Sequence, residues 1–274
     1  MTAPSNHLRP HRRAVLAAGI GALAATPVGA ADKTFSLADW TRYEIRLRAR
    51  LADAGGEAFD ESAAREILTL TNAVRARARA GACAWHPGLA ATARAHAADL
   101  ASRRYVEHLS PEGFDPSHRL CLMERRMNGS ASDNIAYRRA SDATTPQQLM
   151  TLWRGSPKHW ENLLNPRHTH AGFGLVRAED RTYLVGLYAH PAAALSEPLP
   201  FRLSDPATIW RTLQGLPGDL RGGVGTPQGA GAGPRGAEGD TATERRSGVY
   251  QLNVRRRLDA STYELIGGPI FVWS

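Results

Sequence analysis

Residues 153–174 constrain the fold most strongly, because a helix start, a helix stop and a strand start follow one another within this short stretch. Ser156 followed by Pro157 is typical of a helix start, since a serine oxygen can cap free backbone amides and proline suits the first helical position. Asn165 and Pro166 predict the end of that helix. A short helix is therefore expected between these two signals.

A strand is predicted directly after this helix. From Thr169 the sequence alternates, with Phe173 and Leu175 on one face and glycines that let another backbone come close. His170 would then stand at the start of the strand, near the helix that carries His159. Histidines on rigid elements can be aimed at a common point, so these two residues are candidates for a site.

The surrounding chain, from residue 37 to residue 190, predicts several helices that enclose a small antiparallel sheet. Caps and apolar residues at helical spacing predict helices over 37–51, 61–80 and 89–103, and two more that begin near residues 115 and 145. Alternating residues predict a hairpin formed by 171–177 and 183–189, whereas 133–136 are expected in a loop. The predicted fold class is α+β.

The C-terminal part of the chain changes in character. Residues 198–210 predict a strand and a turn, and 216–239 are rich in glycine and proline, which is typical of a flexible linker. Two strands are predicted over 249–258 and 262–273. So few residues cannot build a core alone. This β-hairpin tail must therefore dock on the main domain, pair with 198–210, or contact another molecule.

The first thirty residues have the composition of an export signal. Arg12 and Arg13 precede an uncharged stretch over 14–25, and small residues follow where a signal peptidase would cut. The apolar run is too short to stay in a bilayer. We therefore predict a secreted or periplasmic protein whose mature chain has no transmembrane segment. The arginine pair resembles a twin-arginine signal, and the general export route is the alternative.

The net charge of +8 is not interpreted as a sign of nucleic-acid binding. Lys33 and Lys158 are the only lysines, and three of the arginines lie within the predicted signal. No basic run is interleaved with aromatic residues. A solvated basic surface is predicted, with no nucleic acid among the partners.

Two cysteines, Cys83 and Cys121, would enter an oxidising compartment. A disulfide between them is one hypothesis, because such compartments favour it. Separate burial as two small apolar side chains is the other. The spacing does not decide between the two.

Five motifs occur in a fixed order. They are Leu70-x-Asn72-x-x-Arg75 with Leu89-x-x-x-Ala93-x-x-His96, His108-x-Ser110-Pro111-x-Gly113, Asp133-Asn134-Ile135-Ala136, Trp153-x-x-Ser156-Pro157-x-His159-x-x-Asn162-Leu163-Leu164-Asn165-Pro166, and Thr169-His170-x-Gly172-x-Gly174. Together they resemble the bacterial branch of the CAP superfamily, the SCP-like extracellular proteins. The superfamily is named for cysteine-rich secretory proteins, antigen 5 and pathogenesis-related 1.

The resemblance implies an α-β-α sandwich with a cleft lined by histidines and acids, which in some members holds a divalent cation. The cleft histidines correspond to His108 and His170, and the acid of the family's Glu-Asn-Ile motif corresponds to Asp133. A second acid of eukaryotic members corresponds to Ser156 and is absent here. His159 is a candidate replacement for it. Catalytic residues are not identified.

With the resemblance, the predicted organisation has five parts. They are a signal peptide (1–30), an N-terminal helical extension (31–60), an SCP-like domain (61–192), a linker that is flexible from about residue 216 (193–248), and a C-terminal β-hairpin tail (249–274).

The chemistry of the predicted cleft leaves two hypotheses open. Neutral imidazoles at His108 and His170 can each give a nitrogen to zinc or a similar ion, with Asp133 as a third ligand or as the acceptor that fixes one tautomer. In the alternative, the same residues form a hydrogen-bonded network without metal. His96 is expected to be a packed histidine rather than a ligand.

Two functions follow from these hypotheses. The first is a secreted binding module whose cleft holds a lipid, a peptide or a cell-envelope ligand. The second is a metal-assisted hydrolase of peptidase or esterase type, in which an ion at His108 and His170 activates water and Asp133 or Glu107 acts as base. The sequence contains neither an HExxH pair nor a GxSxG elbow. The binding module is therefore favoured, and the question of enzymatic activity stays open.

Overall fold

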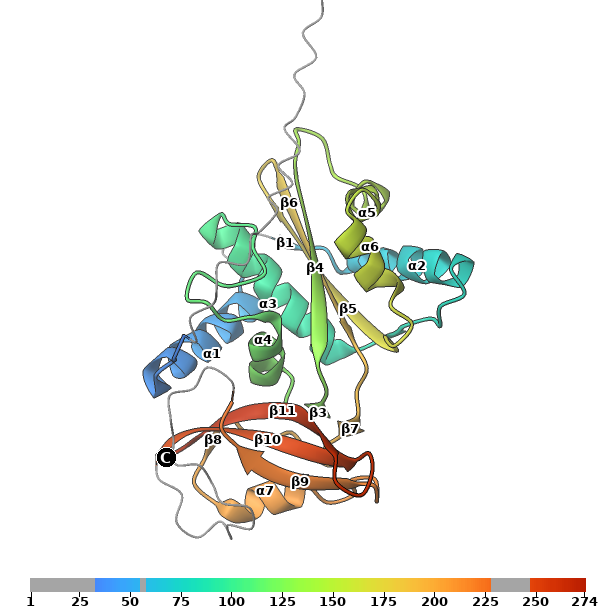
Figure 1. Cartoon of the computed structure of the whole chain (residues 1–274). Helices are drawn as coiled ribbons and strands as arrows, with labels where there is room; N and C mark the ends of the chain where they lie inside the picture. Colours follow the sequence, from blue (N-terminus) through green and yellow to red (C-terminus); the bar gives the residue numbers. More distant parts are fainter. Residues whose placement is uncertain (1–32, 55–57, 228–246) are drawn as a thin grey trace, which may run out of the picture. The chain divides into compact units, whose positions relative to one another are not determined.

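The structure is a computed structural model that describes residues 33–54, 58–227 and 247–274 (Figure 1). The predicted signal peptide, 1–30, lies outside the described residues, as does much of the predicted linker, 228–246. In the described ranges no helix combines the length and the apolar character that crossing a bilayer requires.

An antiparallel sheet forms the centre of the main domain, and its strands follow the order β1-β5-β6-β4. These strands are β1 (Ala58–Phe59), β5 (His170–Ala178), β6 (Arg181–Ala189) and β4 (Ala131–Arg139). A short parallel strand, β2 (Ala84–Trp85), joins the start of β5. The predicted hairpin is confirmed as β5–β6, and His170 is the first residue of β5 as expected.

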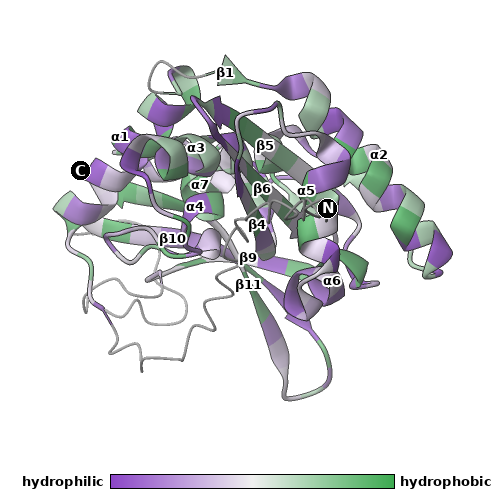
Figure 2. Cartoon of the chain, turned by 90° about the horizontal axis from the view of Figure 1, so that it is seen from above, coloured by the Kyte–Doolittle hydropathy of each residue, from purple (hydrophilic) through white to green (hydrophobic). Residues whose placement is uncertain are grey.

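Helices cover both faces of this sheet, as Figure 1 shows, so the predicted α-β-α sandwich is confirmed. One face packs against α3 (Pro87–Arg103). The other packs against α2 (Glu61–Arg77), α5 (Pro146–Arg154) and α6 (Pro157–Leu164). Along α2, hydrophobic and hydrophilic residues alternate at helical spacing (Figure 2), as expected for a helix with one buried side.

Two of the side chains before helix starts form capping hydrogen bonds, and a third does not. Asp60 caps α2 by accepting from the amide of Ala63, and Thr145 forms a complete capping box with Gln148 at α5. Ser156 does precede α6, but its side chain makes no capping bond. Proline at the first position, with its fixed φ, is therefore the local signal that remains for this helix.

The expectation of a loop at residues 133–136 is wrong, because these residues lie within β4. Their polar character favoured a loop in the sequence. In the structure Asp133 pairs in register with Leu187 of β6, and the polar side chains of Asp133 and Asn134 find partners in neighbouring elements. Pairing with a distant strand therefore overrides the local pattern.

Two further helices complete the main domain. α1 (Leu37–Ala52), predicted almost to the residue, packs against α3 and α4 (Pro116–Met123). α4 ends at Met123, and Met127 lies in the next element, β3 (Met127–Asn128). β3 pairs with β7 (Ala193–Ala194).

A second sheet follows, in the order β8-β11-β10-β9. Its strands are β8 (Arg202–Leu203), β11 (Tyr263–Trp273), β10 (Gly248–Arg257) and β9 (Leu220–Gly225). Both predicted C-terminal strands are confirmed. The expected flexibility from residue 216 is wrong for 220–225, which form β9. Within 198–210, the structure adds α7 (Pro206–Thr212) to the predicted strand.

The C-terminal sheet docks in two of the three ways that the sequence allowed. β11 pairs in parallel with β8, and it also contacts α4 of the main domain. Ile270 of β11 is buried in one apolar cluster with Trp40 of α1 and Leu122 of α4. On the opposite side the sheet forms its own core with Ile209 of α7. The tail is therefore an integral part of the described fold.

The two cysteines are free and separately buried. Cys83 belongs to the core between the central sheet and α2, whereas Cys121 lies in the cluster with α1. Burial raises the pKa of both thiols, that of Cys121 to about 12. The disulfide hypothesis is therefore not supported, and both side chains act as small apolar groups.

Arg75 of α2 is fully buried, and its partners among the described residues are backbone oxygens. Its guanidinium group donates to the carbonyls of Gly81, Leu163, Asn165 and His168 at 2.6–3.1 Å. These bonds satisfy carbonyls at and beyond the end of α6, which otherwise have no partner within the helix. The arginine of the first motif therefore holds the turn between α6 and β5 in place.

Gly172 and Gly174 let α3 lie directly on β5. A Cβ atom at Gly172 would be 2.2 Å from the backbone nitrogen of Ala90, and one at Gly174 would be 2.3 Å from that of Arg94. The helix backbone cannot yield as a flexible side chain would. The glycines of the fifth motif thus fix the distance between helix and sheet.

We predict that Gly172→Ala lowers the free energy of unfolding by about 1–3 kcal/mol or more, because α3 must move away from the sheet. Urea denaturation measures this change. Gly218→Ala is the control, since a Cβ atom there meets nothing within 4 Å. The control should stay within about 0.5 kcal/mol of wild type. Equal stability of the two variants would contradict the close packing.

Candidate functional site

His108 and Asp133 form a hydrogen-bonded pair at the free edge of the central sheet. His108 lies on the loop between α3 and α4, and Asp133 lies on β4. The imidazole Nδ1 is 2.7 Å from the carboxylate Oδ1. The side chain of His108 is 51% exposed, whereas that of Asp133 is buried. With Nδ1 engaged, Nε2 is the ring nitrogen that stays available to a ligand.

Arg119 of α4 holds the other oxygen of Asp133. Its guanidinium group is fully buried and donates to Oδ2 at 3.0 Å. It also donates to the carbonyls of His108 at 2.9 Å and Phe114 at 3.2 Å. The arginine therefore compensates the buried carboxylate and fixes the backbone of the loop that carries the histidine.

Sequence reasoning missed Arg119. The available signal was an arginine placed directly before the apolar run Leu120, Cys121 and Leu122 in a short helix. All four side chains are buried. A charged residue in such a run needs an internal partner. Which partner it takes depends on contacts between distant parts of the chain.

His159 of α6 completes the group, with its ring centroid 6.1 Å from that of His108. The two imidazoles have opposite electrostatic surroundings. The hydrogen bond to Asp133 raises the pKa of His108, although burial opposes it. Burial and the nearby His108 lower the pKa of His159. The site therefore pairs an imidazole that favours the charged form with one that favours the neutral form.

Polar side chains beneath the site fix α6 against β4. Asn134 donates to the carbonyl of His159 at 2.8 Å, and Asn162 donates to the amide oxygen of Asn134 at 2.9 Å. Ser132 donates to Asn162 at 2.7 Å. His168 is buried and lies 3.2 Å from the amide oxygen of Asn162. The position of His159 thus rests on a continuous hydrogen-bonded network.

His170, the fourth predicted residue, has other neighbours. Its Nδ1 is 2.9 Å from Thr169 Oγ1, and its ring lies 5.8 Å from that of His86. Burial lowers the pKa of His170, as do His86 and His190. In the described part of the chain no hydrogen bond or ring contact joins it to His108, Asp133 or His159.

The sheet places the backbone of His170 two strands away from that of Asp133. His170 lies on β5 and Asp133 on β4, with β6 between them. Two interstrand spacings amount to roughly 10 Å. The structure thus brings together His108, Asp133 and His159 and leaves His170 with a different group.

Asp133 is not free to act as a third ligand to an ion at His108 and His170. Both oxygens of Asp133 already have partners, and the cationic Arg119 beside them opposes a second positive charge. Within the described ranges no group of three or more histidine, cysteine and acidic side chains is arranged to hold a metal.

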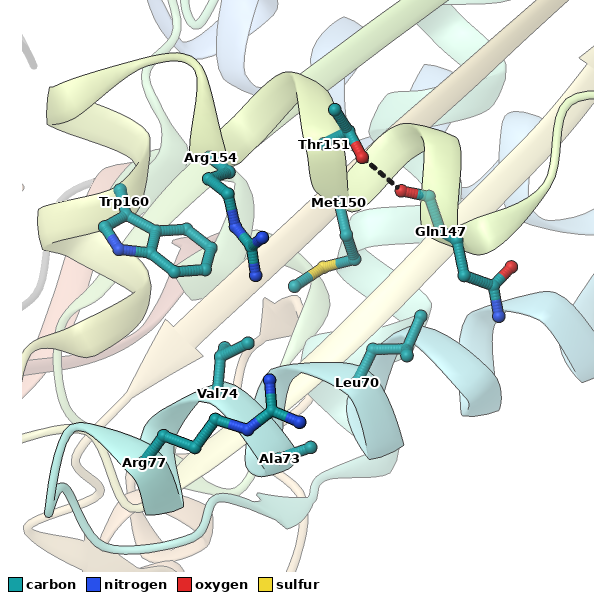
Figure 3. A pocket seen from close by; sticks show the side chains of 9 residues that line it. All are labelled: Leu70, Ala73, Val74, Arg77, Gln147, Met150, Thr151, Arg154 and Trp160. Carbon is teal, nitrogen blue, oxygen red and sulfur yellow. Dashed lines mark hydrogen bonds between the residues drawn. The ribbon is translucent and has the colours of Figure 1, made fainter.

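Two pockets lie near this region, and neither is lined by the four predicted residues. The first, of about 250 Å³, opens between α2 and the α5–α6 segment (Figure 3). Leu70, Val74, Met150 and Trp160 give it apolar walls, and the guanidinium groups of Arg77 and Arg154 lie beside them. Such a lining suits an apolar chain that ends in an anionic group.

The second pocket, of about 610 Å³, is larger and more polar. Its walls come from the main domain and from the C-terminal sheet. The main domain contributes residues 129–132, the segment that follows α6, and His190. The C-terminal sheet contributes Arg256 and residues 264–267. Sequence reasoning did not identify this pocket, because residues far apart in the sequence form it.

Comparison with known proteins places residues 68–188 within the model of the cysteine-rich secretory protein family, CAP. The uncharacterized protein YkwD of Bacillus subtilis is 29% identical over 114 residues, which are 42% of this chain and 42% of YkwD. The uncharacterized membrane protein YlbC of the same organism is 27% identical over 142 residues, or 49% of this chain and 39% of YlbC. The chain thus spans about two fifths of the length of these curated relatives.

Solved structures with partial similarity include two bacterial surface or extracellular proteins. An outer surface protein from Borrelia burgdorferi has a TM-score of 0.45 and 16% identity, and the match covers 50% of this chain and 98% of that one. An extracellular protein containing a SCP domain from Bacillus anthracis has a TM-score of 0.40 and 26% identity, covering 47% of this chain and 41% of that one.

The pair of His108 and Asp133 predicts a specific pH dependence. The pKa of His108 should lie above its ordinary value of 6.5, and Asp133→Asn should lower it. The pair therefore adds stability below pH 6.5, and this contribution disappears as the pH rises through the raised pKa. NMR titration of the histidine Cε1 protons measures the pKa. An equal pKa in wild type and Asp133→Asn would contradict the pair.

The cation predicted at His108 and His170 stays a prediction with a direct test. The full chain is incubated with zinc, desalted and analysed for metal beside His108→Ala and His170→Ala. The geometry predicts that neither substitution changes the retained metal. Loss of one equivalent in both variants would show that the two imidazoles share an ion, as the sequence suggested.

Proposed function

Since residues 68–188 form a CAP domain, we propose that this chain is an extracellular binding module that holds a carboxylate-bearing cell-envelope ligand at His108 and His159. The predicted signal peptide supports the extracellular location. The ligand belongs to the classes expected from the sequence, which are peptides, lipids and envelope components.

One observation carries this proposal: a half-exposed imidazole is held at 2.7 Å by a carboxylate that a buried arginine already compensates. Because Asp133 favours the protonated ring, His108 can present a cationic N–H to a ligand. The neutral ring of His159 lies close enough to donate a second hydrogen bond. Two such donors suit a carboxylate.

The geometry favours binding over hydrolysis. A histidine base needs a nucleophile within hydrogen-bond reach, yet no hydroxyl or thiol bonds to His108 among the described residues. Ser110 is buried, and its Oγ accepts from the amide of Phe114. Both cysteines have raised pKa values. For the metal-assisted alternative, both oxygens of Asp133 already have partners.

A lipid ligand would belong elsewhere on the domain. The apolar pocket between α2 and α5, with Arg77 and Arg154, offers the contacts that an acyl chain with an anionic end requires. The immediate partners of His108, by contrast, are polar. Carboxylate binding at His108 and acyl-chain binding at this pocket are therefore separable by substitution.

The test uses muramyl dipeptide as a carboxylate-bearing envelope fragment and isothermal titration calorimetry as the measurement. We predict that His108→Ala weakens binding about tenfold or more at a pH of about 6, because a charge-assisted hydrogen bond is lost. His170→Ala is the matched control and should bind as wild type does. Wild-type affinity should also fall as the pH rises through the pKa of His108.

Three outcomes contradict the proposal. The fragment binds wild type and His108→Ala equally, it does not bind wild type, or His170→Ala is as weak as His108→Ala. Mass spectrometry of the same samples tests the enzymatic alternative. A cleaved product that disappears in His108→Ala would show a hydrolase.

A further inference from the structure

The C-terminal hairpin has one strand edge without a neighbouring strand. β11 pairs with β10 along its length, but β8 covers its other edge only at Val272 and Trp273. Nearer the hairpin tip, Gly129 donates its amide to the carbonyl of Gly267 at 2.9 Å. Between Tyr263 and Ile266 no strand of the described chain pairs with this edge.

The bond at Gly267 shows which backbone groups face outward. In an antiparallel ladder, the N–H and C=O of one residue point to the same side, and the side alternates from residue to residue. Gly267 points away from β10, and the register continues regularly from Gly267 to Tyr263. Leu265 therefore presents its N–H and C=O at the open edge, as does Tyr263.

This edge borders the larger pocket. Leu265, Ile266 and Gly267 line it on one side, and Ser132, Asn162 and His168 line it on the other. A volume of about 610 Å³ lies within the range of sites that hold a ligand. The pocket therefore places an unpaired backbone donor and acceptor beside several polar side chains.

The charges around the pocket favour an anionic occupant. Arg167 is exposed and forms no ion pair in the described part of the chain, and His190 is exposed beside it. Glu264 is the one acid in the lining, and its carboxylate is bound by Arg256 at 3.2 Å. The formal charge of the residues that line the pocket is thus positive.

The hairpin tip adds exposed apolar surface. Leu265 is 66% exposed, Tyr263 is 54% exposed and Leu258 is 61% exposed. Figure 2 shows the end of the β10–β11 hairpin projecting from the rest of its sheet. Large apolar side chains in such a position offer contacts to alternate side chains of an added strand.

We propose that the pocket between the CAP domain and the C-terminal hairpin binds an extended peptide that carries an acidic side chain. The peptide backbone pairs with the open edge of β11 at Leu265, and its carboxylate reaches Arg167. Strand addition supplies main-chain hydrogen bonds and lets neighbouring pockets select side chains. This site is separate from His108, and it recognises an extended peptide backbone as well as a carboxylate.

The test uses a synthetic pentapeptide, Thr-Val-Glu-Val-Thr, acetylated and amidated, titrated into the full chain and followed by NMR of backbone amides. We predict shifts at Leu265, Gly267 and Arg167. Leu265→Pro removes one outward N–H and should weaken binding about fivefold or more. Arg167→Glu should weaken it by a similar factor, whereas Arg202→Glu, an exposed arginine of β8, should not.

Two peptide controls separate backbone from charge recognition. Replacing the peptide glutamate by glutamine should remove the effect of Arg167→Glu, and N-methylation of the central peptide bonds should abolish binding. His108→Ala should leave the peptide-induced shifts at Leu265, Gly267 and Arg167 unchanged, so failure here is distinguishable from failure at the His108 site. If Leu265→Pro does not fold, Arg167→Glu and the N-methylated peptide still test the proposed peptide site.

The proposal is overturned if the pentapeptide causes no shifts, or if the shifts map away from β11. It is overturned if sedimentation shows a dimer that Leu265→Pro converts to a monomer. It is also overturned if vesicles of phosphatidylcholine and phosphatidylglycerol, at a ratio of about 3:1, shift the amides of Tyr263 and Leu265 and the peptide does not.

Discussion

The buried charge of Arg119 is the constraint on which the site depends. A guanidinium group without contact to water must find acceptors inside the protein. Its acceptors are Asp133 on β4 and the carbonyls of His108 and Phe114 on the loop before α4. One side chain therefore joins a helix, a strand and a loop, and the position of the half-exposed His108 is a consequence of that compensation.

The C-terminal sheet rests on the same part of the molecule. Ile270 packs with Trp40 and Leu122, and the side chain of Gln251 donates to Cys121 of α4. α4 thus carries Arg119 on one side and supports the C-terminal sheet on another. The larger pocket forms where this sheet extends past α4 toward the end of α6. The larger pocket therefore depends on how the two parts of the chain are docked.

What the sequence predicted well was local. Asp60 and Thr145 mark helix starts because their side chains cap amides of the first helical turn. The β5–β6 hairpin follows from alternation and a short turn. What it missed was nonlocal. Asp133 was expected in a loop because only its pairing with β6 makes it a strand residue, and no local signal reveals that β6 lies between β5 and β4. The shared cleft of His108 and His170 came from the family resemblance and stays a prediction.

The central claim is that Arg119 and Asp133 act as one buried unit that holds His108. A double-mutant cycle of unfolding free energies tests it, with Arg119→Met, Asp133→Asn and both together. Each single substitution should cost about 3–5 kcal/mol, because it leaves one group uncompensated. The double mutant should be more stable than the sum predicts, by about 2 kcal/mol. Additive losses would show that the two charges do not depend on each other and would contradict the account.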